Sequence, residues 1–237
     1  MFNISYFCNV GTPHKKNQDR VLVNGRIIND GVFSQDLLPA VNCFVADGIG
    51  SMENSENAAQ FVLEALSSIN YKLSPNSETE IIDLLTFTNS RLVQLNHKMG
   101  LFRESATTLC GLLISEKGLL TVNVGDSEIL LIKRGTISRI TAPHVLDDTV
   151  FNSPITSYLG SQKDKMRCDF TFNHFEFAPG DILIVTTDGL RKVIDDNSLI
   201  ELLSQPTPLS KRVGDMYQSI TAKEAPDNLG AVFIQNN

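Results

Sequence analysis

Runs of apolar residues, some continuous and some alternating with polar residues, predict a series of β-strands along the chain. These runs lie at residues 4–10, 20–25, 42–47, 107–115, 119–126, 128–135, 136–141, 169–178, 180–189 and 229–235. Short polar segments at 116–118 and 134–135 join two pairs of neighbouring runs. We therefore expect two β-hairpins in the middle of the chain.

Two segments between these runs carry apolar residues at helical spacing instead. In the first, the apolar positions are Ala58, Phe61, Val62, Ala65, Leu66 and Ile69. The second runs from about residue 78 to 99 and begins with acidic residues, and its stripe consists of Ile81, Leu85, Thr88, Leu92 and Leu95. A later helical stretch at 197–223 is interrupted by Pro206 and Pro208. Antiparallel strands with two groups of helices indicate an α+β fold, with sheets in the middle and helices outside.

The composition of the chain argues against zinc-binding, membrane-spanning and nucleic-acid-binding proteins. The 237 residues contain no internal repeat or linker-like run, so we expect one domain over residues 1–237. The cysteines form no C-x-x-C pair and lie mostly in apolar runs, which favours buried thiols in a cytoplasmic protein over a zinc site. The first ten residues have no basic region and no long apolar region, so we expect no signal peptide, and no apolar run approaches the roughly 20 residues of a membrane helix. The net charge of −7 argues against nucleic acid as a partner.

Aspartates recur at the ends of the predicted strands. Asp47, Asp126 and Asp188 each end an apolar run, Asp227 precedes the last run, and Asp19 precedes the run at 20–25. Any one of them alone is explained by capping of a turn, a common use of Asp beside Gly. The repeated setting is harder to explain this way, because a lone buried carboxylate is costly unless it is paired, hydrogen-bonded or metal-bound. Oxygen donors without His or Cys suit Mg²⁺ or Mn²⁺, and Gly48 would let a backbone carbonyl approach the same ion.

Seven short segments cover nearly the whole chain and follow one another in a specific order. They are "VGTPHKKNQDR", "FVADGIGS", "SATTLCGLLI", "LTVNVGDSEILLIKRG", "ITSYLG", "GDILIVTTDGL" and "APDNLGAVFI". In this order they resemble the metal-dependent Ser/Thr protein phosphatases of type 2C (the PPM family), especially the compact bacterial members. The resemblance implies a four-layer α-β-β-α sandwich with two central antiparallel sheets flanked by helices. It also implies hydrolysis of phosphoserine or phosphothreonine in a protein substrate, in opposition to a Ser/Thr kinase.

The same resemblance implies a set of site residues and ions. Two Mn²⁺ or Mg²⁺ ions about 3.5–4 Å apart would activate the attacking water, without a covalent phospho-enzyme. Asp47 would bridge the ions, with the Gly48 carbonyl on one and Asp188 and Asp227 on the other. Asp19 would orient the metal-bound water or support the ligands from behind. Asp126 falls where some members hold a third ion.

The sequence departs from the family pattern around the phosphate and the ions. His14 stands where the family usually has an arginine that grips the phosphate, which predicts weaker, pH-dependent binding unless Lys15 or Lys16 substitutes. The alternative for His14 is an exposed loop residue without a role. Gln18 replaces a common glutamate, so we expect one ion to be held less tightly. Lys192 replaces the later aspartate of the third ion and opposes binding there, which leaves Asp126 as a possible structural turn residue.

Three further expectations concern a loop near the site, an asparagine and two histidines. Residues 140–160 leave only a short connection where the family usually has a long flap, which should open the site. Asn228 is expected to support Asp227 by hydrogen bonding. His144 and His174 are interpreted as ordinary solvent-facing histidines.

Two other functions compete with the enzyme. One is a pseudophosphatase that binds phosphoproteins without turnover, and His14, Gln18 and Lys192 favour it mildly. The retention of Asp19, Asp47, Gly48, Asp188 and Asp227 favours the enzyme. The other is a structural Ca²⁺ protein, which would need its ligands packed in one loop of the D-x-D-x-D-G kind, and the sequence contains no such loop.

Overall fold

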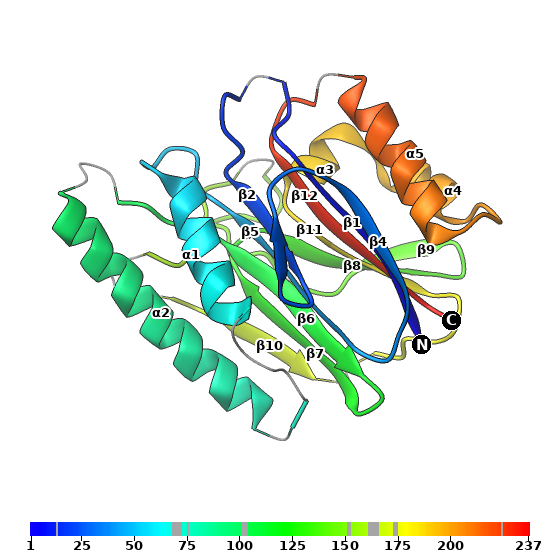
Figure 1. The fold of residues 1–237 in the computed structure, drawn as a ribbon, viewed down its shortest axis with the longest axis horizontal. Helices are drawn as coiled ribbons and strands as arrows, with labels where there is room; N and C mark the ends of the chain where they lie inside the picture. Colours follow the sequence, from blue (N-terminus) through cyan, green and yellow to red (C-terminus); the bar gives the residue numbers. More distant parts are fainter. Residues whose placement is uncertain are drawn as a thin grey trace.

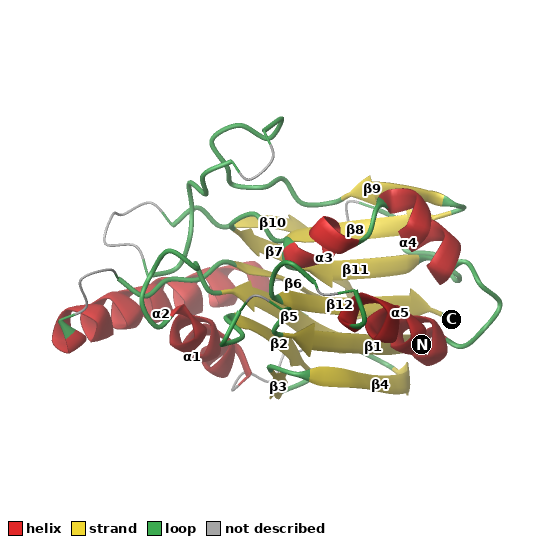
Figure 2. Cartoon of the chain, turned by 90° about the horizontal axis from the view of Figure 1, so that it is seen from above, coloured by secondary structure: helices red, strands yellow, loops and turns green. Residues whose placement is uncertain are grey.

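Two antiparallel sheets are stacked face to face between two layers of helices (Figure 1). In the computed structural model of the chain, the described residues are 1–12, 14–67, 73–74, 76–100, 104–150, 153–160, 166–172, 175–223 and 225–237. Figure 2, seen from above, shows the strands of both sheets lying along roughly the same axis, with arrows that point both ways along it. The predicted α+β sandwich is confirmed.

The first sheet contains both chain termini at neighbouring positions, because β1 and β12 pair along their whole length. Its strands, in spatial order, are β4 (Gly31–Leu38), β1 (Phe2–Asn9), β12 (Leu229–Asn236), β11 (Ile182–Thr186), β8 (Glu128–Lys133) and β9 (Thr136–Arg139). The second sheet consists, in order, of β10 (Asp169–Phe172), β7 (Gly118–Val124), β6 (Leu109–Ser115), β5 (Val41–Asp47), β2 (Asp19–Val23) and β3 (Arg26–Ile28). The predicted hairpins are confirmed as β6–β7 and β8–β9.

The central strands are buried on both faces, which is why they read as continuous apolar runs. In β5, Cys43 and Val45 face the core between the two sheets, whereas Phe44 faces the helices. In β1, Tyr6 likewise lies between the sheets and Phe7 packs on the other side. Successive side chains of a strand point to opposite faces, so one strand contributes to two cores.

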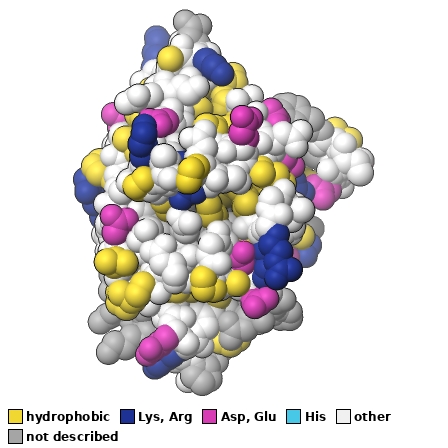
Figure 3. Space-filling model, turned by 90° about the vertical axis from the view of Figure 1, so that its right-hand side faces the viewer, with side chains coloured by type: hydrophobic (Ala, Val, Ile, Leu, Met, Phe, Trp, Pro, Cys, Tyr) yellow, Lys and Arg dark blue, Asp and Glu magenta, His cyan; other side chains and the backbone are white. Residues whose placement is uncertain are grey.

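Each sheet is covered on its outer face by its own helices. The helices α1 (Ser55–Ser67) and α2 (Ser77–Met99) pack on the second sheet, as Figure 1 shows at its left. The helices α3 (Gly189–Val193), α4 (Asp196–Leu203) and α5 (Leu209–Thr221) pack on the first sheet. Acidic, basic and hydrophobic side chains are interspersed over the face that carries α4 and α5 (Figure 3). No helix in the described part of the chain has the length and apolar character needed to cross a bilayer.

Most predicted elements are present, with a few differences. The second helix begins at Ser77 and ends at Met99, close to its predicted bounds, although Leu95 in its stripe is 36% exposed. The predicted strand at 169–178 is shorter, because β10 ends at Phe172 and residues 175–178 are not a strand, while 173–174 lie outside the described residues. The predicted stripe position at Ile69 also lies outside them. The strands β3 and β4 and the short helix α3 were not predicted.

Candidate functional site

The strand-end aspartates converge at one end of the two sheets. In the second sheet, Asp19 opens β2 and pairs directly with Asp47, the last residue of β5. In the first sheet, Asp188 follows β11 and Asp227 precedes β12, and these two strands are neighbours. Asp126, in the turn between β7 and β8, lies close enough to act electrostatically on Asp47. The topology therefore brings together all five aspartates that the sequence pointed to.

A threonine ties the two sheets together at this point. Thr187 Oγ1 donates a hydrogen bond to Asp19 Oδ2 at 2.7 Å and accepts one from the backbone N of Gly230 at 3.0 Å. A Cβ at Gly230 would lie 3.2 Å from Val21 Cγ2 and 3.5 Å from Asp19 Oδ2, so the two sheets are in close contact here. Sequence reasoning missed Thr187, although it stands directly before Asp188 in "TTDG".

The backbone around Asp47 is fixed from the neighbouring chain segment. Asp47 N donates to Thr108 Oγ1 at 3.1 Å, and Thr108 N donates to the Asp47 carbonyl at 2.8 Å. A Cβ at Gly48 would lie 2.6 Å from the carbonyl oxygen of Ser55, the first residue of α1. The glycine thus lets the end of β5 approach α1 closely, and the role of its carbonyl as a metal ligand stays a prediction.

The concentration of carboxylates raises their pKa values. Burial raises the pKa of Asp47 well above its usual range, and the four neighbouring aspartates raise it further. Burial likewise raises the pKa of Asp19 to about 7, helped by Asp188 and Asp227 and opposed by the Thr187 hydrogen bond. The pKa of Asp126 rises to about 6, again mainly through burial. Such a cluster of partly desolvated negative charge is stabilised by any cation that enters it.

A cation of the chain itself enters this cluster. Lys192 Nζ donates to Asp188 Oδ2 and to Asp227 Oδ2, each at 2.5 Å. Burial alone would lower the pKa of Lys192, but the hydrogen bonds to the two carboxylates raise it above its usual value. Lysine 192 is therefore a direct neighbour of two predicted metal ligands and not only a substitution at a third-ion position.

Asp227 contacts its expected partner Asn228, although through the backbone, and it also contacts His14, which was expected at the substrate phosphate. His14 Nε2 lies 3.3 Å from Asp227 Oδ1, which places His14 at the site. Asn228 supports Asp227 through its backbone N, which donates to Oδ1 at 2.8 Å. The Asn228 side chain instead holds two backbone groups, since Oδ1 accepts from Gln18 N at 2.8 Å and Nδ2 donates to Val10 O at 2.5 Å.

Two other residues considered in the sequence analysis, Lys16 and His144, have partners outside the aspartate cluster. Lys16 pairs with Glu56 in the first turn of α1 at 2.6 Å. The prediction that His144 faces solvent was wrong, because it is 1% exposed: its Nδ1 accepts from Gly125 N at 3.2 Å and its Nε2 lies 3.2 Å from Asp169 Oδ2. The backbone of Gly125 bonds to both the ring and the backbone of His144, and these contacts hold the histidine in a buried position. His174 lies outside the described residues.

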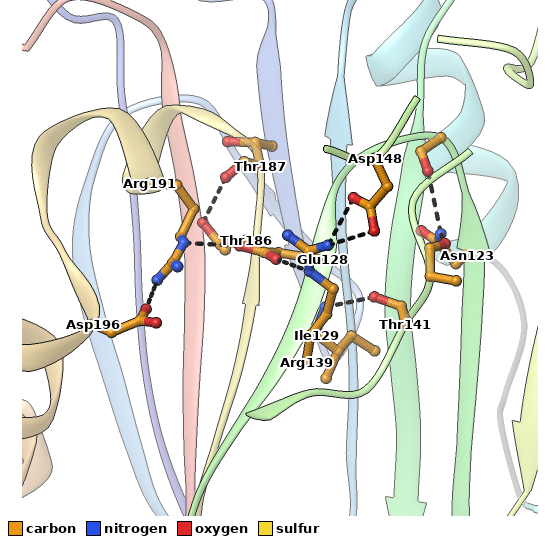
Figure 4. A network of polar contacts seen from close by, with 12 residues as sticks. Asn123, Glu128, Ile129, Arg139, Thr141, Asp148, Thr186, Thr187, Arg191 and Asp196 are labelled. Carbon is orange, nitrogen blue, oxygen red and sulfur yellow. Dashed lines mark hydrogen bonds and ion pairs between the residues drawn. The ribbon is translucent and has the colours of Figure 1, made fainter. Parts of the chain in front are cut away.

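A polar network borders the site on one side (Figure 4). Glu128, which is 5% exposed, accepts from Arg139 Nε at 2.8 Å and lies 3.2 Å from Arg191 Nε. Each arginine also contacts a more exposed aspartate, Asp148 or Asp196. A cleft of about 430 Å³ runs along this network and is lined by residues that include Asp126, Asp188, Lys192, Val145 and Val150. Residues within 143–150 and Ser153 of the connection between β9 and β10 thus form one wall of a cleft that reaches the aspartates.

The aspartates of the site fit only in part the Mn²⁺ or Mg²⁺ ions that the family resemblance implies. In the described part of the chain, no group of three or more His, Cys, Asp or Glu residues is arranged to hold a metal. Two observations nevertheless fit an ion. Burial and like charge raise the pKa of Asp47, and Asp126 Oδ1 is buried without a hydrogen-bond partner among the described residues. The Asp188–Asp227 pair fits less well, because it already binds Lys192.

Comparison with known proteins tests the resemblance independently. The family model for protein phosphatase 2C matches residues 18–233. The Ser/Thr phosphatase stp of Listeria welshimeri is 24% identical over 232 residues, which cover 88% of this chain and 89% of that protein. The protein phosphatase PhpP of Streptococcus pneumoniae is 22% identical, covering 99% of this chain and 97% of that protein.

Solved structures agree on the fold. The Ser/Thr phosphatase Stp1 from Staphylococcus aureus superposes with a TM-score of 0.82 at 20% identity, covering 100% of this chain and 96% of that one. PppA of Pseudomonas aeruginosa gives a TM-score of 0.80 at 22% identity, covering 99% and 97%. With a family match over most of its length, the chain belongs to the protein phosphatase 2C family, and the predicted enzyme class, phosphoprotein phosphatase, is confirmed.

Proposed function

We propose that this protein removes phosphate from phosphoserine or phosphothreonine of a protein substrate, opposing a Ser/Thr kinase, and depends on Mn²⁺ or Mg²⁺. The observation that carries the proposal is the convergence of Asp19, Asp47, Asp188 and Asp227 from two sheets onto one point. A bound divalent ion would offset charge on the phosphoryl oxygens and make a water more acidic. The named relatives, which are phosphatases, support the same activity.

We assign the roles of the residues from their positions. Asp47 would bind the ion together with the Gly48 carbonyl, because glycine has no side chain that would block an ion beside its backbone. Asp19 is held through Oδ2 by Thr187, so its other carboxylate oxygen can orient the attacking water and accept its proton. His14 lies beside Asp227 and, when protonated, would donate to a phosphoryl oxygen.

The two-ion arrangement and the single domain over residues 1–237 stay predictions, as does a cytoplasmic protein that binds neither nucleic acid nor membrane. For Asp126, the Oδ1 without a hydrogen-bond partner among the described residues supports an interaction with a cation, while the nearby charge of Lys192 already stabilises the ionised carboxylate.

The experiment measures release of phosphate from a phosphothreonine peptide with Mn²⁺ present and then removed by a chelator. We expect turnover that disappears with the ion and returns when it is added back. Asp47→Asn should reduce turnover by about 100-fold or more, whereas Asp36→Asn, an exposed change on β4, should leave it unaltered. Binding of the peptide without turnover at any Mn²⁺ concentration would show a pseudophosphatase and refute the proposal.

A further inference from the structure

The Asp188–Asp227 pair already holds a positive charge supplied by the chain. Lys192 lies on α3, one helical turn after Asp188, and this spacing places its ammonium beside that carboxylate. The same ammonium lies 2.5 Å from Asp227 Oδ2. Asp227 comes just before β12, the strand that pairs with β11. The Lys192 side chain is only 18% exposed, so the charge is largely withdrawn from solvent into the site.

Asp227 has both of its carboxylate oxygens engaged. Oδ2 accepts from Lys192, while Oδ1 accepts from Asn228 N at 2.8 Å and lies 3.3 Å from His14 Nε2. A divalent ion that used Asp227 as a ligand would have to compete with at least one of these partners. This position therefore differs from Asp47, where carboxylates rather than cations are the close electrostatic neighbours.

The ammonium and a divalent ion exclude each other from these oxygens. Mg²⁺ binds carboxylate oxygens at about 2.0–2.1 Å. An ion on Oδ2 of either aspartate would therefore lie within about 4.6 Å of Lys192 Nζ, given the 2.5 Å hydrogen bonds. At such a separation, in a partly buried site, the repulsion between the two cations is much larger than thermal energy.

We propose that Lys192 takes the place of one of the two ions, so that the chain binds a single divalent ion, at Asp47 and the Gly48 carbonyl. This inference rests on the proposed function, because it concerns the same site. The lysine then acts as a fixed positive charge opposite the ion. Two of its three N–H donors bond to the carboxylates, and the third can donate to a phosphoryl oxygen of the substrate.

The test counts the ions. Wild type, Lys192→Ala, Lys192→Gln and a control variant are titrated with Mn²⁺ by calorimetry, and magnetic coupling between neighbouring Mn²⁺ ions is read by electron paramagnetic resonance. The control is Lys211→Ala, which removes the same charge from an exposed pair with Asp215 on α5. Lys192→Gln removes the charge but keeps N–H donors on a side chain that is one atom shorter, and circular dichroism verifies that each variant is folded.

We expect one uncoupled Mn²⁺ in the wild type and in Lys211→Ala, and two coupled ions in both Lys192 variants. The affinity for the second ion should rise by about 100-fold or more when Lys192 is replaced. Two coupled ions in the wild type, or a single ion in the folded Lys192 variants, would overturn this inference and leave the proposed function standing. A failure of all four proteins to bind Mn²⁺ would overturn both.

Discussion

The raised pKa of Asp19 predicts an unusual effect of Asp19→Asn on the metal-free protein. The carboxyl has a pKa of about 7 in the folded chain and an ordinary value of 3.8 when unfolded. Between these values the folded state binds more protons than the unfolded state, so stability falls as pH rises through this window. An asparagine resembles the protonated carboxyl and can still accept the Thr187 hydrogen bond, so the variant escapes this loss.

The size of the effect follows from linkage. Each pH unit within the window changes the free energy of unfolding by at most about 1.4 kcal/mol for one group. Between pH 5 and 7.5 the Asp19 contribution therefore falls by roughly 2 kcal/mol. Asp126, with a pKa of about 6, and His144, whose pKa burial lowers, also change stability with pH. Both are present in wild type and variant, so they enter the comparison equally. Asp47 does not cancel, because the Asp19 charge helps to raise its pKa, and loss of that charge adds to the advantage of the variant at pH 7.5.

The assay is urea unfolding in the presence of a chelator at the two pH values. We expect Asp19→Asn to match the wild type at pH 5 and to exceed its stability by about 2 kcal/mol at pH 7.5, which is a midpoint shift on the order of 1 M urea. Asp36→Asn, exposed on β4, should show no such pH dependence. Added Mn²⁺ should reverse the order at pH 7.5, because an ion favours the ionised carboxyl. A variant that is equally destabilised at both pH values would refute the reasoning.

Three further substitutions test the packing and the network. Glu128→Ala should cost about 1–2 kcal/mol in urea unfolding, less than the 3–5 kcal/mol of a fully buried pair, because both arginines that it contacts are partly exposed; a cost above 3 kcal/mol would contradict this. Gly189→Ala would place a Cβ 1.9 Å from the Asn228 carbonyl oxygen, so it should lower both the thermal midpoint and turnover. Its control, Gly214→Ala in α5, has open space and should stabilise by up to about 1 kcal/mol; equal effects of the two would contradict the argument. Leu63→Ala, on the buried face of α1, should cost about 2–5 kcal/mol in the same assay, and a cost below 1 kcal/mol would show that this core is looser than the structure indicates.

The sequence was sufficient to place the carboxylates at strand ends, because central strands buried on both faces are long apolar runs with sharp ends. It failed at β4, where Ser34, Gln35 and Asp36 interrupt the apolar pattern. This strand lies at the edge of its sheet and pairs only with β1, so much of it faces water. Edge strands carry a weaker hydrophobic signal for this reason.

In the site, too, some contacts follow from local spacing in the sequence, whereas others depend on how distant segments pack together. The spacing of Asp188 and Lys192 is readable from the sequence, since residues four apart meet on a helix. The second contact of Lys192, with Asp227, depends on the pairing of β11 with β12, which no local pattern reveals. The hydrogen bond of Thr187 to Asp19 depends in the same way on the stacking of two sheets.

The bond between Thr187 and Asp19 has a consequence for the molecule as a whole. Asp19 and Asp47 belong to one sheet, and Asp188 and Asp227 are carried by the other. The spacing between the two halves of the carboxylate cluster is therefore set by the side chains that pack between the sheets, such as Val21, whose Cγ2 would lie 3.2 Å from a Cβ at Gly230. Packing between the sheets thus controls the distances among the aspartates. A substitution that changes side-chain volume there would alter the geometry of the cluster, even though none of the aspartates is replaced.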